Sequence, residues 1–222
     1  MSTTNMLRKN DLTKIFFIVM IVAMFSSCLN LKKEYPEITY YGLTPDKRLI
    51  DSLNTQDVAV LLRNVEVPEA FSVRSIIANV DNKTIQRYFY FRWINDLSYL
   101  VTDFVESILI EYKLFGRGVV RNSSITLPDY FLESRIIEMD IRNSTINPDS
   151  NFVALSVNFN FFKRTETKEG NKLIFSKTFD HKVKRPNNFA ESIPPAVSKS
   201  LSVICDYAVA EMSKAIILES VE

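Results

Sequence analysis

The feature that most constrains the fold is a pair of long segments near the C-terminus in which apolar and polar residues alternate. Residues 152–162 and 173–183 both show this alternation, and the polar residues 163–172 separate them. Because successive side chains of a strand point to opposite faces, the alternation predicts two strands that each bury one face. Two such strands joined by a polar loop predict an antiparallel hairpin. The predicted inward residues are Val153, Leu155, Val157, Phe159, Phe161, Leu173, Phe175, Phe179 and Val183.

The rest of the chain supplies further strands and two helices. Tyr40, Tyr41 and Leu43 are expected to form a first edge strand or to dock on the core. Strands are predicted over residues 57–67, 71–80, 85–93, 117–123 and 128–142, the last with a bulge or twist because its alternation is imperfect. On the strand over 85–93, the predicted core face comprises Ile85, Phe89, Phe91 and Trp93.

Apolar residues recur at spacings of three and four over residues 95–114 and 188–219, which predicts two amphipathic helices. Pro194 and Pro195 place the continuous start of the second helix near residue 194. Its outer face is predicted to carry small residues that would let another backbone approach closely, namely Ser198, Ser200, Ser202, Ala210 and Ser213. The predicted class is α+β: a mostly antiparallel or mixed sheet with two long helices on one face, in the order βββαββββα.

Residues 15–28 have the layout of an export signal. Basic residues precede an apolar run of about a dozen residues, and Ser26 and Ser27 lead into Cys28. A membrane-spanning helix needs roughly 20 apolar residues, but the apolar run stops near residue 25 and residues 30–34 are largely polar. We therefore expect a lipoprotein signal over 1–27, cleavage between Ser27 and Cys28, and covalent diacylglycerol and N-acyl chains on Cys28. Residues 28–39 are expected to form a tether, and residues 40–222 a single domain.

Composition disfavours several classes of function. Removing the first 27 residues takes away three of the 27 basic and one of the 26 acidic residues, which leaves a nearly neutral chain. Nucleic-acid binding favours a concentrated basic face. With one histidine, His181, and Cys205 as the second cysteine, the chain has no zinc pattern, and Cys205 is expected to be buried. No catalytic or metal site is predicted; carboxylates such as Glu133, Glu138 and Asp140 are expected to be solvated.

A partner surface is predicted around the strand over 85–93. Tyr88, Tyr90 and Arg92 alternate with the predicted core residues, and Tyr40 and Tyr41 lie on the preceding edge segment. Tyrosine and arginine are enriched at protein interfaces. The alternative is that the tyrosines pack under a helix with their hydroxyl groups at its edge.

The order of these features resembles the ABC-type transport auxiliary lipoprotein family, the PqiC-like group, from about Tyr40 to Ile217. The resemblance rests on the lipid-attachment residue Cys28, on the Tyr-Tyr-x-Leu opening with Pro45 soon after, and on a Val-x-Val strand that ends at Pro68. It also rests on a strand leading to Trp93 before the first long helix, and on the late hairpin followed by a helix rich in alanine and serine.

The resemblance implies a non-catalytic subunit that docks on the mammalian-cell-entry-domain protein of an ABC transporter. Such systems move phospholipids or other hydrophobic molecules between the two membranes. Separately from the resemblance, the expected location is the periplasmic face of the outer membrane, because Leu29 stands in place of an aspartate after Cys28 and is compatible with delivery there. No nucleic acid is expected, and a homo-oligomer is left open. The alternative function is a stand-alone lipid- or small-molecule-binding or structural envelope lipoprotein, which would need an apolar pocket between the sheet and the helices to bind a lipid.

Overall fold

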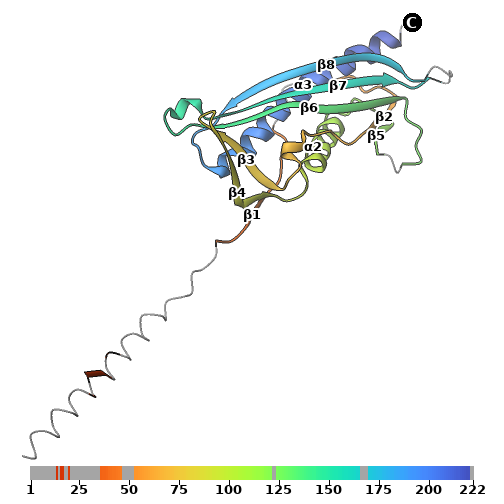
Figure 1. The fold of residues 1–222 in the computed structure, drawn as a ribbon. Helices are drawn as coiled ribbons and strands as arrows, with labels where there is room; N and C mark the ends of the chain where they lie inside the picture. Colours follow the sequence, from red (N-terminus) through yellow and green to blue (C-terminus); the bar gives the residue numbers. More distant parts are fainter. Residues whose placement is uncertain are drawn as a thin grey trace, which may run out of the picture. The chain divides into compact units, whose positions relative to one another are not determined.

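The computed structural model describes residues 14, 16, 17, 20, 36–46, 53–121, 124–165 and 170–220. The chain divides into two compact units, Met1–Glu37 and Ile38–Glu222. The strands and helices described below all belong to the second unit (Figure 1).

The second unit is an α+β domain with an eight-stranded mixed sheet and two long helices, which confirms the predicted class. Four strands precede the first helix instead of three, because the opening tyrosine segment pairs as an edge strand. The strands are β1 (Thr39–Tyr41), β2 (Ala59–Leu62), β3 (Ser75–Val80), β4 (Thr84–Trp93), β5 (Gly118–Val120), β6 (Tyr130–Asn143), β7 (Phe152–Lys163) and β8 (Lys172–Lys184). The helices are α2 (Leu97–Tyr112) and α3 (Ile193–Glu219).

The long strand β6 organises the sheet (Figure 1). The β7–β8 hairpin pairs with one edge of β6, and both junctions are antiparallel. At the other edge, β2 pairs with the start of β6 and β3 with its end, both in parallel. The sheet then continues from β2 to β5, and from β3 through β4 to β1.

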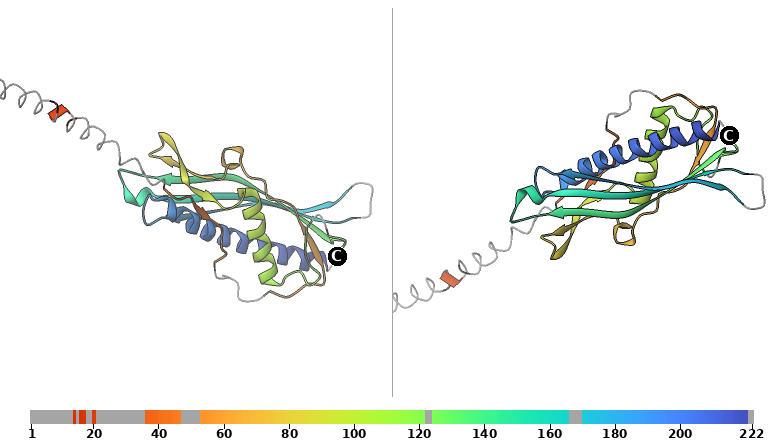
Figure 2. Two further views of the ribbon diagram at one scale, coloured as in Figure 1. Left: turned by 90° about the horizontal axis from the view of Figure 1, so that it is seen from below. Right: turned by 90° about the horizontal axis from the view of Figure 1, so that it is seen from above.

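Both helices cover the same face of this sheet, as the two views in Figure 2 show. Helix α3 packs under β7 and β8, and α2 packs against α3 and β5. The core between the layers includes the predicted inward residues of β7, all of which are buried. Burial of these apolar side chains, at about 25 cal/mol per Å² of surface, is the main force holding the layers together.

The predicted hairpin is confirmed, but one of its inward residues was placed wrongly. The β7–β8 register shifts between Phe161 and Phe162, so β8 carries one extra residue, Ile174. This bulge reverses the alternation: Phe175 faces inward, whereas Leu173 is exposed. A similar bulge at Ile137 interrupts β6, as its imperfect alternation predicted.

Helix α3 begins at Ile193 with prolines in its first turn, as predicted, and a short 3-10 helix (Ala190–Ser192) precedes it. Two predictions about the helix are wrong. Phe189, which falls within the predicted range 188–219, precedes α3 and is exposed, and four of the residues placed on the outer face are buried, namely Ser198, Ser200, Ser202 and Ser213. The close backbone approach does occur, but the backbone belongs to the same chain: residues 42–46, called the arm here, lie across α3.

Candidate interaction surface

The candidate functional site is the edge of the sheet formed by β1 and the end of β4. The two strands are parallel, with Thr39 opposite Phe91, Tyr40 opposite Arg92 and Tyr41 opposite Trp93. The backbone N–H of Ile94 then donates to the carbonyl of Tyr41 at 2.9 Å. Since opposite residues of paired strands share a face, Tyr40 and Arg92 lie on one face and Tyr41 and Trp93 on the other.

A bulge in β4 decides which side chains are exposed. Ser75 of β3 pairs with Arg92 and the next residue, Ile76, pairs with Tyr88, so residues 89–91 have no counterparts on β3. The alternation is therefore reversed between Tyr88 and Phe91, and both of these residues pack against the core with buried Trp93. The prediction that Ile85 and Phe89 face the core is wrong: both are exposed.

The five predicted interface residues consequently divide into two groups. Tyr40 and Tyr90 are exposed and Arg92 is half-exposed on the outer face. Tyr41 faces inward and stacks on Phe91.

Tyr88 is also directed inward and makes polar contacts with its hydroxyl group. This group accepts a hydrogen bond from the side-chain amide of Asn143 at 2.6 Å and donates to the carbonyl of Asn188 at 3.3 Å. Burial raises the pKa of Tyr88. Tyr88 thus matches the alternative in which a tyrosine packs inside with its hydroxyl group satisfied.

Three apolar residues that the sequence reasoning did not assign to the site complete its outer face. Ile38 is two residues before Tyr40, and Ile94 is two residues after Arg92, so both side chains point to the outer face. Phe89 is exposed at the bulge of β4. The signal that could have found Ile38 and Ile94 is their even spacing from Tyr40 and Arg92. We call this surface the edge patch, and its members are Ile38, Tyr40, Phe89, Tyr90, Arg92 and Ile94. All of them except Arg92 are large apolar or aromatic residues, and these are between 41% and 64% exposed.

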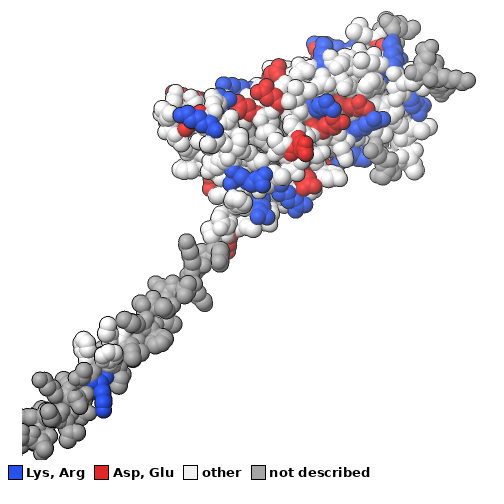
Figure 3. Space-filling model, in the orientation of Figure 1, with Lys and Arg blue, Asp and Glu red and all other residues white. Residues whose placement is uncertain are grey.

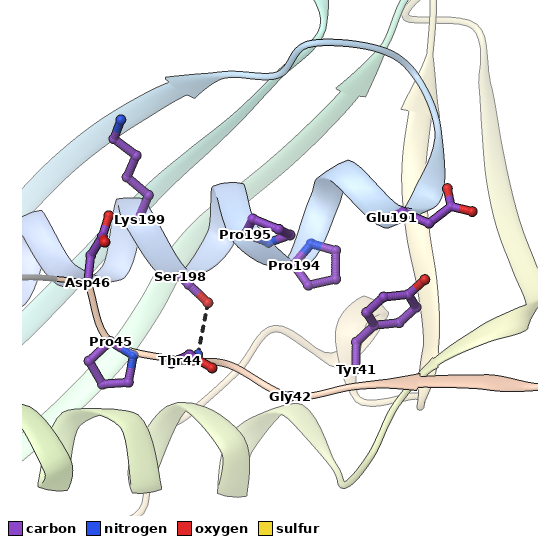
Figure 4. A pocket seen from close by; sticks show the side chains of 10 residues that line it. All are labelled: Tyr41, Gly42, Thr44, Pro45, Asp46, Glu191, Pro194, Pro195, Ser198 and Lys199. Atoms are coloured by element: carbon purple, nitrogen blue, oxygen red, sulfur yellow. Dashed lines mark hydrogen bonds between the residues drawn. The ribbon is translucent and has the colours of Figure 1, made fainter.

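A depression of about 390 Å³ lies on the inner side of β1, between the arm and the start of α3 (Figure 4). Tyr41 and the two prolines of α3 form its apolar walls, and its charged groups are Asp46, Glu191 and Lys199. Burial and the nearby carboxylate of Glu191 raise the pKa of Tyr41. The depression is open to solvent, so it does not provide the enclosed apolar cavity that a lipid carrier would need.

The residues considered for catalysis lie apart from the edge patch. Cys205 is buried in α3, and burial raises the pKa of its thiol. The carboxylate of Glu133 pairs with Arg63, and that of Asp140 pairs with Arg142. Among residues 36–46, 53–121, 124–165 and 170–220, no group of three or more His, Cys, Asp or Glu side chains could hold a metal ion.

Charge is mixed over the face seen in Figure 3, where basic and acidic side chains alternate across the outer side of the sheet. Ion pairs of the domain include Arg135 with Glu66 and Lys184 with Asp149.

The predicted cleavage and lipidation residues, Ser27 and Cys28, lie outside the described residues. In the part of the chain that is described, no helix is both long enough and apolar enough to cross a bilayer.

No family model matches the chain, and no curated protein matches its sequence. Solved structures match its fold. A crystal structure of a Xanthomonas campestris protein of family DUF330 gives a TM-score of 0.67 at 12% identity, covering 83% of this chain and 100% of that one. A crystal structure of an uncharacterized protein gives 0.51 at 13% identity, covering 81% and 99%. A hypothetical protein from Chlamydia trachomatis gives 0.48 at 9% identity, covering 72% and 98%. The first two matches show that this chain shares their fold.

Proposed function

We propose that the protein is a lipid-anchored subunit of the bacterial cell envelope, cut before Cys28 and held on the membrane by acyl chains on that residue. The observation that carries this proposal is where the folded unit starts. The unit spans Ile38–Glu222 and contains all eight strands and both long helices. Residues 1–37 lie outside this unit, which is compatible with a role in export and anchoring. Several acyl chains hold a protein on a bilayer where one chain binds only reversibly.

The specific role we propose is that of an accessory subunit of an ABC-type transport system with a mammalian-cell-entry-domain protein, on the periplasmic face of the outer membrane. The order of sequence features supports this role, as does the fold, which is the one the resemblance implies. The subunit would act by binding and not by catalysis.

The test is to isolate the protein from native membranes through a C-terminal tag in mild detergent. We expect intact-mass analysis to show a chain that begins at acylated Cys28, together with a mammalian-cell-entry-domain protein. Recovery of the acylated subunit alone, while other envelope complexes survive the same extraction, would overturn the transport role. An uncut, unacylated chain would overturn the anchor itself.

A further inference from the structure

The edge patch brings exposed apolar side chains and one basic side chain together at the edge of the sheet. Ile38 lies just before β1, and Tyr40 lies within it. Tyr90 and Arg92 lie at the neighbouring end of β4, and Ile94 follows directly after that strand. Phe89 is added by the bulge. Contiguous exposed apolar surface of this kind marks an interaction site more often than isolated exposed residues do.

Arg92 differs from most arginines of the domain. Its Nε donates to the carbonyl of Phe89 at 3.0 Å, and no carboxylate of the described residues forms an ion pair with it. By contrast, carboxylates pair with Arg63, Arg74, Arg117, Arg121, Arg135 and Arg142. The terminal nitrogens of Arg92 are therefore available to an external anion, and guanidinium groups bind phosphate well because they donate two parallel hydrogen bonds.

The length of the tether restricts what can reach the edge patch. Ile38 follows Cys28 by ten positions, and an extended chain spans at most about 3.6 Å per residue. Ile38 therefore stays within roughly 36 Å of an acylated Cys28, less than the thickness of a bilayer with its headgroups. Because the tether makes contact with the membrane intramolecular, even a weak surface affinity is sufficient for occupancy.

The composition of the edge patch suits the headgroup layer. Tyrosine is enriched where membranes meet water because its ring is apolar and its hydroxyl group is polar. Isoleucine and phenylalanine side chains can enter the boundary between headgroups and acyl chains, and arginine can bind lipid phosphate.

We propose that the edge patch lies on the headgroup layer of the bilayer that holds the anchor, with Arg92 on a lipid phosphate. This inference rests on the proposed lipid anchor. It assigns the edge patch to lipid, and leaves the other surfaces of the domain to a protein partner.

The test uses the full lipidated chain in vesicles of phosphatidylethanolamine with a minor fraction of phosphatidylglycerol. The variant Phe89→Cys is labelled with an environment-sensitive fluorophore; acylated Cys28 and buried Cys205 do not compete for the label. The matched control is Ile125→Cys, which is fully exposed and lies between β5 and β6. Headgroup nitroxide lipids should quench the label at position 89 several-fold more than at position 125. Equal quenching at both positions would overturn the proposal.

A second variant separates side-chain contact from mere proximity. In the Phe89→Cys background, we expect Tyr40→Ser with Tyr90→Ser and Arg92→Ser to reduce the quenching to the level of the control. The matched variant Ile137→Ser with Ile146→Ser, at exposed residues outside the edge patch, should leave it unchanged. Quenching that persists in the edge-patch variant, or a label shielded only after a protein partner is added, contradicts the proposal.

Flotation with the vesicles keeps the two proposals distinguishable. A chain that does not float lacks its anchor, which is a failure of the proposed function. A chain that floats but whose label is not quenched refutes only the contact between the edge patch and lipid.

Discussion

Arg185 is the residue on which the buried polar contacts at one end of the sheet converge. It is 1% exposed, and burial lowers its pKa. Its five N–H groups all donate to neutral acceptors at 2.8–3.2 Å, so the buried charge is fully hydrogen-bonded. The acceptors are Ser192 Oγ, Asn143 Oδ1 and the carbonyls of Arg142, Asn187 and Phe189. Arg185 thus joins the ends of β6 and β8 to the start of α3.

Replacing Arg185 with methionine should lower the free energy of unfolding by roughly 2–4 kcal/mol, because several buried acceptors lose their donors. The measurement is urea denaturation of the purified domain. Arg63→Met is the matched control, since Arg63 forms an exposed ion pair with Glu133 and such pairs contribute at most about 1 kcal/mol. Equal losses in both variants would contradict the role assigned to Arg185.

Gly116 is needed for a close backbone approach. A Cβ at this position would lie 2.8 Å from the carbonyl oxygen of Gln56, to which the Gly116 N–H already donates at 2.6 Å. We expect Gly116→Ala to destabilise the domain by about 1–3 kcal/mol, as overpacking does. Gly42→Ala is the control because no atom lies within 4 Å of its Cβ position. Thermal unfolding of the two variants side by side tests the difference.

Helix α3 shows how an element acquires a partner from elsewhere in the chain. The Ser198 hydroxyl accepts a hydrogen bond from the backbone N–H of Thr44 at 3.1 Å, drawn in Figure 4. The Ser202 hydroxyl accepts one from the N–H of Asp46 at 2.9 Å. The arm is therefore fastened to α3 by two side chains spaced one turn apart.

Ser198→Ala with Ser202→Ala should loosen the arm without unfolding the core, since each bond contributes about 1 kcal/mol. Hydrogen exchange by mass spectrometry should show faster exchange at Thr44 and Asp46. Ser200→Ala is the matched control, because its hydroxyl group donates to the carbonyl of His181 instead. Unchanged exchange in the double variant would rule out these bonds as the fastening.

Two ion pairs fasten the C-terminal end of α3 to the β7–β8 hairpin. The Glu219 carboxylate contacts the ammonium groups of Lys172 at 2.8 Å and Lys163 at 3.0 Å, and these hydrogen bonds lower its pKa below the usual 4.5. Its contribution to stability is therefore complete above about pH 4.5 and is lost as the pH falls through the lower folded-state value. Glu219→Gln should reduce the melting temperature more at pH 7 than at pH 3. An equal loss at both pH values would contradict this assignment.

Local patterns predicted the elements well wherever the alternation was uninterrupted. Strand β7 matched at every inward position because the bulges in its two pairings lie on the partner strands, at Ile137 of β6 and Ile174 of β8, and leave its own alternation intact. The bulges at Ile174 and at residues 89–91 were not foreseeable, since each depends on pairing with a neighbouring strand. Ser198 was misplaced for a related reason: the arm that covers it lies about 150 residues away in the chain.

The candidate site was only partly predictable. Tyr40, Tyr90 and Arg92 followed from residue type and alternation. Tyr88 did not, because the β4 bulge places it on the core side. Ile38, Phe89 and Ile94 look like core residues by type. The even spacing of Ile38 and Ile94 from Tyr40 and Arg92 is a signal for these two, whereas the exposure of Phe89 depends on the bulge in β4.

At the scale of the whole molecule, we expect the proposed anchor to be independent of the folding of the domain. Replacing Cys28 with alanine should release the protein from the membrane or impair its export, while leaving the unit Ile38–Glu222 folded. Fractionation of cells followed by limited proteolysis measures both properties. A variant that stays membrane-bound with its signal uncut would show that the short apolar run acts as the anchor. A released but unfolded domain would contradict the independence of the two units.

The pairing of β1 also has a mechanical consequence. Any force on an anchored Cys28 passes along the tether and enters the domain at β1, which is paired with β4 over only three residues. The next restraints along the chain are the two serine contacts of the arm with α3. Neither restraint includes the β6–β7–β8 sheet. We therefore expect β1 and the arm to detach under load before the β6–β7–β8 sheet is strained.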